Sequence, residues 1–307
     1  MAENRTNNFS ILSLWLIVFL DMIGVGIVIP ILAPLFLSAG AYLLPASYDF
    51  GTRTMLLGFL LATYPLAQFF GAPLLGALSD HHGRKKILLL SLLGTFVGYI
   101  LFAIALLTRN MPLLFFSRVL DGFTGGNISI AMSSIADLSD EKSKAKNFGL
   151  VGMACGLGFI FGPYIGGKLS DSSIVSWFNF ATPLWFAAIL TALNILLLMF
   201  KFKDTSTTRI RTKISLLTGF RNIKKAFELR NLRVAFLVVF LLTLGFSFFT
   251  QFFQVFLIKK FDFTQSRIGD FFAYTGLWIA FAQGFVTRLV SKKLNPRQTL
   301  YFSTLLL

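Results

Sequence analysis

The feature that most constrains this chain is a series of apolar stretches, each about twenty residues long, that recur along most of the sequence. As an α-helix, about twenty residues cover the roughly 30 Å of hydrocarbon in a bilayer. Hydrophobic residues make up 55% of the 307 residues, and charged residues make up only 13%. That charged share is about half of what an ordinary soluble domain carries. The sequence therefore predicts an all-α polytopic membrane protein.

Eight of the apolar stretches are long enough to be complete spans. They are expected at residues 9–36, 55–78, 87–107, 112–136, 147–169, 179–200, 232–258 and 267–290. A ninth run, 300–307, meets the chain end and would rise only about 12 Å as a helix, so we expect a truncated second half. The predicted domains are a six-helix N-terminal bundle at 1–200, a basic linker at 201–231 and an incomplete C-terminal bundle at 232–307.

The net charge of +15 is distributed unevenly between alternate loops. One side, which includes the linker, holds most of the 28 Lys and Arg residues. The loops of the other side hold Arg53, Arg109, Lys168, Lys259, Lys260 and Arg267. Because cytoplasmic loops are enriched in Lys and Arg, we expect the N-terminus and the linker in the cytoplasm. The positive charge is thereby explained without a nucleic-acid partner.

The sequence contains few of the residue groups that enzymes and metal sites use. Cys155 is the one cysteine, and the two histidines, His81 and His82, are adjacent. A single thiol cannot form an internal disulfide, and these three residues make no convincing metal cluster. There is also no nucleophile–base–acid set and no phosphate-binding loop. We therefore expect neither an enzyme nor a protein with a cofactor or metal.

Four sequence motifs lie within or between the first five predicted spans. The loop after the second span reads GALSDHHGRKK, from Gly76 to Lys86, and the fifth span contains GFIFGPYIGG. The first span contains LDMIGVGIVIP, and the fourth contains RVLDGFTGGN. Together they resemble the motifs of the major facilitator superfamily, in particular its drug/proton antiporters of the tetracycline-resistance type. The resemblance implies a major facilitator fold in the bacterial inner membrane, a small-molecule substrate exchanged for protons, and a monomer for the complete protein.

The loop motif predicts a charge cluster at the cytoplasmic ends of the helices. Gly76 and Gly83 permit a tight reversal, and Asp80 and Arg84 supply opposite charges. We expect Arg84 to pair with Asp137, at the end of the fourth span, and Asp80 to interact with a helix N-terminus in the second half. The resemblance implies that this cluster gates one alternating-access state. The alternative is a topological signal without a gating role.

Small residues in the fifth span predict close helix packing. Gly158, Gly162 and Gly166 lie four residues apart and therefore share one helix face. Pro163 removes a backbone hydrogen bond and favours a kink, and Gly167 follows the stripe. The eighth span carries a similar stripe, made of Gly276, Ala280 and Gly284. We expect these two spans to form a hinge and seal between the halves, with ordinary small-residue packing as the alternative.

Three ionisable residues are expected inside the membrane, where charge is costly and usually faces a partner or a cavity. By helical rise, Asp21 lies about 12 Å from the outer face, and Arg118 and Asp121 lie about 9 and 14 Å from it. An arginine can hold one carboxylate ionised while the other takes up a proton. The three residues therefore predict a proton-coupling site, with a static buried pair that fixes helix register as the alternative.

The substrate cavity is less defined than the coupling site. Its candidate residues are the polar or aromatic side chains Tyr64, Gln68, Asn127, Gln251 and Gln254. The 37 phenylalanines would suit a cavity for bulky lipophilic cations or amphiphiles. The leading hypothesis is proton-coupled efflux of small lipophilic drugs or metabolites by alternating access. The alternatives are a truncated, non-transporting membrane protein and a symporter that takes up a small solute.

Overall fold

The computed structural model describes residues 2–37, 43–45, 47–140, 143–202, 204, 218–229, 233–282, 285 and 298. Over these residues the chain is helical, without strands, which confirms the predicted all-α class. The helices are α1 (Ala2–Leu37), α2 (Phe50–His82), α3 (Arg84–Leu107), α4 (Met111–Thr124), α5 (Asn127–Leu138), α6 (Lys144–Leu169), α7 (Thr182–Lys201), α8 (Thr218–Glu228), α9 (Arg233–Phe261) and α10 (Gln265–Phe281).

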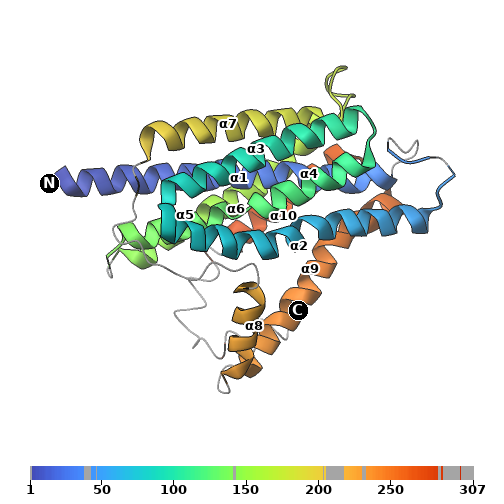
Figure 1. Ribbon diagram of the computed structural model, residues 1–307. Coiled ribbons are helices and arrows are strands. Elements are labelled where there is room, and N and C mark those ends of the chain that lie inside the picture. The colour runs from blue at the N-terminus through green and yellow to red at the C-terminus, as the bar shows by residue number, and fades with distance from the viewer. Residues whose placement is uncertain are drawn as a thin grey trace.

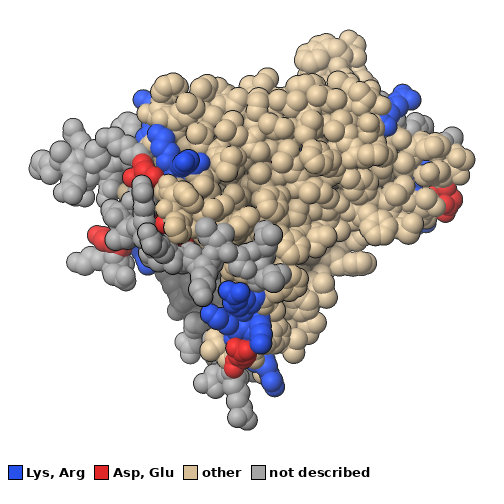
Figure 2. All heavy atoms as spheres, viewed as in Figure 1, with Lys and Arg blue, Asp and Glu red and all other residues tan. Residues whose placement is uncertain are grey.

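Six of the described helices have membrane-spanning segments that are long and apolar enough to cross a bilayer. They are Ile11–Leu37, Phe50–His82, Arg84–Leu107, Asn147–Leu169, Thr182–Lys201 and Arg233–Phe261. On the face seen in Figure 2, Lys, Arg, Asp and Glu lie toward the two ends of the bundle and on α8, and a broad band between the ends carries none of them. A band of this kind suits the hydrocarbon layer of a membrane.

The fourth predicted span, 112–136, is not one continuous helix but two, α4 and α5, and the span itself stays a prediction. The chain is helical in α4 up to Thr124 and again in α5 from Asn127, and it breaks at Gly125 and Gly126. Two successive glycines have the weakest helix propensity of any residue other than proline. The break is also held from outside, because Gln68 Nε2 of α2 donates a hydrogen bond of 2.6 Å to the Gly125 carbonyl.

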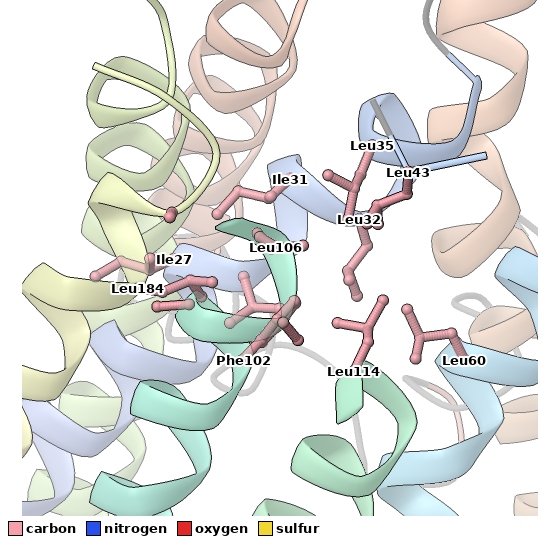
Figure 3. Packing of buried hydrophobic residues seen from close by; sticks show 14 of the residues in the cluster. Ile27, Ile31, Leu32, Leu35, Leu43, Leu60, Phe102, Leu106, Leu114 and Leu184 are labelled. Atoms are coloured by element: carbon pink, nitrogen blue, oxygen red, sulfur yellow. The ribbon is translucent and has the colours of Figure 1, made fainter. Parts of the chain in front are cut away.

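The bundle is organised around α1, which packs along α6 and α7 (Figure 1). Next to it, α3 packs against α4 and α7, and α2 packs against α4. The apolar core forms two clusters along the bundle. One contains Ile31, Phe102 and Leu184 (Figure 3), and the other contains Leu14 and Leu88. Buried polar side chains lie at or near the boundary between these two clusters on four of the helices, and they form the polar layer of the bundle: Asp21 of α1, Thr95 of α3, Arg118 and Asp121 of α4, and Thr191 of α7.

The two ends of the bundle are named here by a residue that lies at each. At the Arg84 end, α2 ends and α3 begins, and at the Lys168 end, α6 ends. The described second-half helices meet the bundle near the Lys168 end, where Lys259 Nζ of α9 lies 4.7 Å from the ring centre of Phe50. The other end of α9 diverges from the bundle (Figure 1), and side chains such as Phe240 are exposed.

About half of the predicted linker, 201–231, lies outside the described residues, and the predicted ninth run, 300–307, lies entirely outside them. The described part of the linker includes α8, whose Phe220 packs against Phe69 and Phe70 of α2 with ring centres 5.0 and 5.9 Å apart. The domain boundaries at 200 and 232 stay predictions.

Candidate functional site

At the Arg84 end, one guanidinium joins two carboxylates. Arg84 Nε lies 3.1 Å from Asp137 Oδ2, so the expected pair between these residues is present. Arg84 also pairs with Asp80, one helical turn before it. The expectation that Asp80 faces a helix N-terminus of the second half is not met among the described residues. The described parts of α9 and α10 approach the bundle near its opposite end.

A third carboxylate at this end, Asp204, escaped the sequence analysis. Its Oδ1 accepts a hydrogen bond of 3.0 Å from the backbone N–H of Arg84, the first residue of α3. Gly83, between α2 and α3, has a φ of +101°, and a Cβ there would lie 2.2 Å from Asp204 Oδ2. The one feature of the sequence that could have indicated this contact is an acidic residue at the start of a strongly basic linker. Asp204 thus ties the start of the linker to the turn between α2 and α3.

The stripe of Gly158, Gly162 and Gly166 faces α1, not the eighth predicted span, so that part of the prediction is wrong. A Cβ on Gly162 would lie 2.6 Å from Gly26 Cα, and one on Gly166 would lie 2.2 Å from the Ile27 carbonyl oxygen. The glycines therefore let the backbones of α1 and α6 come into direct contact within the first half. The stripe is a packing surface of the bundle and not the seam between halves.

The seam between the halves is formed by another face of α6 that meets α10. A Cβ on Gly269 would lie 2.5 Å from the Pro163 carbonyl oxygen, and one on Gly167 would lie 3.1 Å from Gly269 Cα. A Cβ on Gly276 would lie 2.7 Å from Ile160 Cγ1. The expected contact between the fifth and eighth spans is therefore present. Of the stripe predicted on the eighth span, Ala280 is exposed and Gly284 lies outside the described residues.

Polar contacts close this seam at the Lys168 end. Lys168 Nζ lies 2.8 Å from Asp270 Oδ2 and donates to Ser266 Oγ at 2.9 Å. Gln265 Nε2 donates to the Ser170 carbonyl at 3.1 Å. These contacts join the end of α6 to the start of α10, and the sequence analysis did not identify them.

In the polar layer of the bundle, Arg118 and Asp121 form an ion pair within α4. Arg118 Nη2 lies 3.2 Å from Asp121 Oδ2, and the two residues are only 4% and 3% exposed. The guanidinium carbon of Arg118 also lies 4.3 Å from the ring centre of Phe102, a cation–π arrangement. Among the described residues, Arg118 Nε and Nη2 have no hydrogen-bond partner. A buried charge whose donors are incompletely paired costs stability, and such charges inside a membrane bundle typically serve a function.

Asp21 lies in the same layer but has a different partner from the one expected. Its Oδ1 accepts a hydrogen bond of 2.8 Å from Asn127 Nδ2, and it is 9% exposed, so it does not face lipid. Within the described structure, no ion pair joins Asp21 to Arg118. The three residues therefore do not form one cluster. Arg118 and Asp121 form an ion pair within α4, and the carboxylate of Asp21 on α1 is hydrogen-bonded to the Asn127 side chain instead.

The five candidate cavity residues do not gather around one cavity. Tyr64, Gln68 and Asn127 lie around the α4–α5 break, where Gln68 and Asn127 donate to Gly125 and Asp21. Gln254 is buried on α9, and Gln251 is exposed. A separate apolar groove of about 680 Å³ lies between α2 and α9, and none of the five lines it. Its lining residues are Phe50, Gly51, Thr54, Met55, Gly58, Phe59, Ala62 and Phe252.

Comparison with known proteins shows which family this chain and its fold resemble. Residues 14–307 match the model of the Major Facilitator Superfamily. The tetracycline resistance protein of class H from Pasteurella multocida is 30% identical, over 96% of this chain and 70% of that protein. The class C protein from Escherichia coli is 31% identical over the same shares. The crystal structure of the human organic anion transporter MFSD10 matches with a TM-score of 0.70 at 23% identity, over 91% of this chain and 72% of that one, and shows the same fold.

The matches confirm the predicted major facilitator fold and the resemblance to the tetracycline-resistance type, and they confirm that the protein is not an enzyme. A multi-pass membrane protein follows from the family and from the apolar helices. With its buried charges inside an apolar bundle and its close-packed glycine face, this chain belongs to the major facilitator superfamily of membrane transporters, in the group of the tetracycline-resistance proteins.

Proposed function

We propose that the protein exports a small lipophilic drug in exchange for protons, by alternating access. The observation that carries the proposal is the buried layer of Asp21, Arg118 and Asp121 in an otherwise apolar bundle. Ionisable groups at such depth typically serve proton or substrate pathways. Because the relatives are tetracycline resistance proteins, a tetracycline is the first substrate to test.

The orientation proposed with this function puts the Arg84 end in the cytoplasm of a bacterial inner membrane. Support comes from the excess of Lys and Arg in the loops of that side. The described halves then meet at the outer end, through α6 and α10, and α9 diverges at the inner end (Figure 1). This arrangement corresponds to a state that is closed toward the outside.

Transport is tested with purified protein in proteoliposomes. Under an imposed pH gradient, we expect tetracycline to accumulate on the side from which protons leave, and an uncoupler to abolish the accumulation. The 307-residue chain and any longer product of the same gene are assayed side by side. Movement of drug and protons in the same direction would instead indicate a symporter. Absence of gradient-driven movement for both proteins would overturn the proposal and favour a non-transporting membrane protein.

The contact between Lys168 and Asp270 gives a prediction for the closed outer end. Changing Lys168 to Glu places two negative charges opposite each other and should weaken closure. Because this pair is half-exposed, the expected effect is modest, about fivefold at most in the open-to-closed ratio. The measurement is disulfide cross-linking between cysteines placed at Ser170 and Gln265, in a Cys155→Ala background.

The matched control for this prediction restores the pair in reverse. The double variant Lys168→Glu with Asp270→Lys should recover the cross-linking yield of the parent protein. Equal yields in all three proteins would show that the ion pair does not contribute to closure.

A further inference from the structure

The most informative feature that the proposed function leaves unused is α5, a short helix with a polar contact to another helix near each end, buried at Asn127 and more exposed at Asp137. Its first residue, Asn127, donates to the Asp21 carboxylate, and near its other end Asp137 pairs with Arg84. At the Asn127 end it is separated from α4 by Gly125 and Gly126. A single rigid element therefore contacts both the buried carboxylate and the charge cluster at the Arg84 end.

We propose that Asn127 is a positioning residue that transmits the protonation state of Asp21 through α5 to the Arg84–Asp137 contact. The inference rests on the proposed proton coupling. It identifies how protonation in the polar layer affects the charge cluster at the Arg84 end of the bundle. Asn127 itself takes up no proton. Its role is to hold α5 in one position while Asp21 is ionised.

The contacts of Asn127 make it sensitive to charge on Asp21. Asn127 is 4% exposed, and its Nδ2 lies 2.8 Å from Asp21 Oδ1, a hydrogen bond strengthened by the negative charge of the acceptor. Its own Oδ1 accepts from the Ser91 hydroxyl of α3. Both ends of the amide are thus engaged, which fixes its orientation across α1, α3 and α5.

Ser91 offers an alternative arrangement. Its hydroxyl has one hydrogen to donate, yet two acceptors lie within reach, Asn127 Oδ1 and the Thr124 carbonyl at the end of α4. If the amide moves away, Ser91 can donate to Thr124 alone, so no buried hydroxyl is left without a partner. The Ser91 hydroxyl therefore keeps a hydrogen-bond partner whether or not the Asn127 amide stays in place, which favours movement of α5 at the break.

The proton step is a simple addition and release. A proton from the outer water adds to the Asp21 carboxylate, which becomes a neutral carboxylic acid, and it later leaves to the cytoplasmic water. While Asp21 is neutral, its bond from Asn127 loses the charge assistance, and α5 is freer to move at the glycine break. The other titratable or charged groups in electrostatic range of this layer are Asp121, Arg118, Tyr64, Tyr99 and Cys155.

The chain offers a matched control for Asn127. Asn194 of α7 is also buried, at 1% exposed, and also donates to α1, but to the Ile17 backbone carbonyl at 2.9 Å and not to a carboxylate. Asn127→Leu and Asn194→Leu each remove one buried amide that anchors α1. Only the first removes a contact that depends on protonation. Asn127→Gln keeps the amide donor and serves as the conservative variant.

The test follows α5 without requiring a known substrate. A cysteine replaces Ser133 of α5 in a Cys155→Ala background. Its rate of maleimide labelling is measured in proteoliposomes between pH 5 and pH 8. The labelling rate of a free cysteine peptide at each pH corrects for the change in thiolate content. We expect the corrected rate in the parent to change several-fold with pH. The change should be lost in Asn127→Leu and in Asp21→Asn, kept in Asn194→Leu and partly restored in Asn127→Gln.

Tetracycline transport is measured on the same proteins. Gradient-driven transport should fall at least about tenfold in Asn127→Leu, the size expected for losing a hydrogen bond to a charged group. The control Asn194→Leu should retain both gradient-driven transport and counterflow exchange at equal pH. A pH response of α5 that survives Asn127→Leu, or that is absent from the parent, would overturn the inference. The expected labelling pattern without tetracycline transport would support the role of Asn127 and count against the proposed substrate alone.

Discussion

Replacing Asp21 and Asp121 together by asparagine is expected to lower proton-driven export by about a hundredfold. Asparagine has nearly the same shape as aspartate but cannot take up or release a proton in this pH range. The two residues are the carboxylates of the buried polar layer, at 9% and 3% exposed. Positioned proton-transfer groups typically contribute a hundredfold or more to a rate, so transport driven by a pH gradient should fall by about that factor. The measurement is tetracycline accumulation in proteoliposomes under an imposed gradient.

The control must separate lost coupling from lost folding. Asp121→Asn leaves the Arg118 charge buried without its carboxylate, which can cost about 3–5 kcal/mol. A second variant, Asp21→Asn with Asp121→Asn and Arg118→Gln, removes the whole ion pair and the unpaired charge. Both variants should elute as a single species and retain counterflow exchange. Gradient-driven export that persists in the Asp21→Asn, Asp121→Asn protein would rule out these carboxylates as the coupling site.

Local features of the site could be predicted from the sequence because they depend on spacing along one helix. Arg118 and Asp121 are three residues apart, so they share a face of α4 and pair in the structure. The pair between Arg84 and Asp137 could also be anticipated, because both residues lie at helix ends on the same side of the membrane. In both cases helix geometry and topology sufficed.

The partner of Asp21 could not be predicted in this way. Depth along the helix axis follows from helical rise, and Asp21 does lie in the polar layer with Arg118. Its direction around the axis depends on how α1 is rotated against its neighbours, and hydropathy contains little information on that rotation. The glycine break before Asn127 was hidden as well, since glycines are tolerated within apolar spans.

The glycine stripe of α6 was predicted as a packing surface but assigned to the wrong neighbour. A sequence shows that Gly158, Gly162 and Gly166 leave room for another backbone, and it does not show which backbone enters. In the structure α1 fills that space, and the adjacent face with Pro163 and Gly167 meets α10. The two faces therefore have different roles, which mutation can separate.

Changing Gly162 and Gly166 together to alanine is expected to destabilise the first-half bundle strongly. The added Cβ atoms would lie 2.6 Å from Gly26 Cα and 2.2 Å from the Ile27 carbonyl oxygen. Both obstacles are backbone atoms of α1, so no side-chain rotation can relieve the overlap. Overpacking of this kind costs about 1–3 kcal/mol at each site. We expect the thermal unfolding midpoint of the purified protein to fall by about 10 °C.

The same helix provides the control. Gly152 and Gly156 precede the stripe on α6, and a Cβ on either one would meet no atom within 4 Å. Their double change to alanine should shift the midpoint by less than about 2 °C, since alanine is also the better helix former. If both double variants lowered the midpoint equally, the loss would reflect glycine content of α6 and not its contact with α1. A fall confined to Gly162 and Gly166 would show that the antiporter-type glycines stabilise the first-half bundle through α1, independently of any motion between the halves.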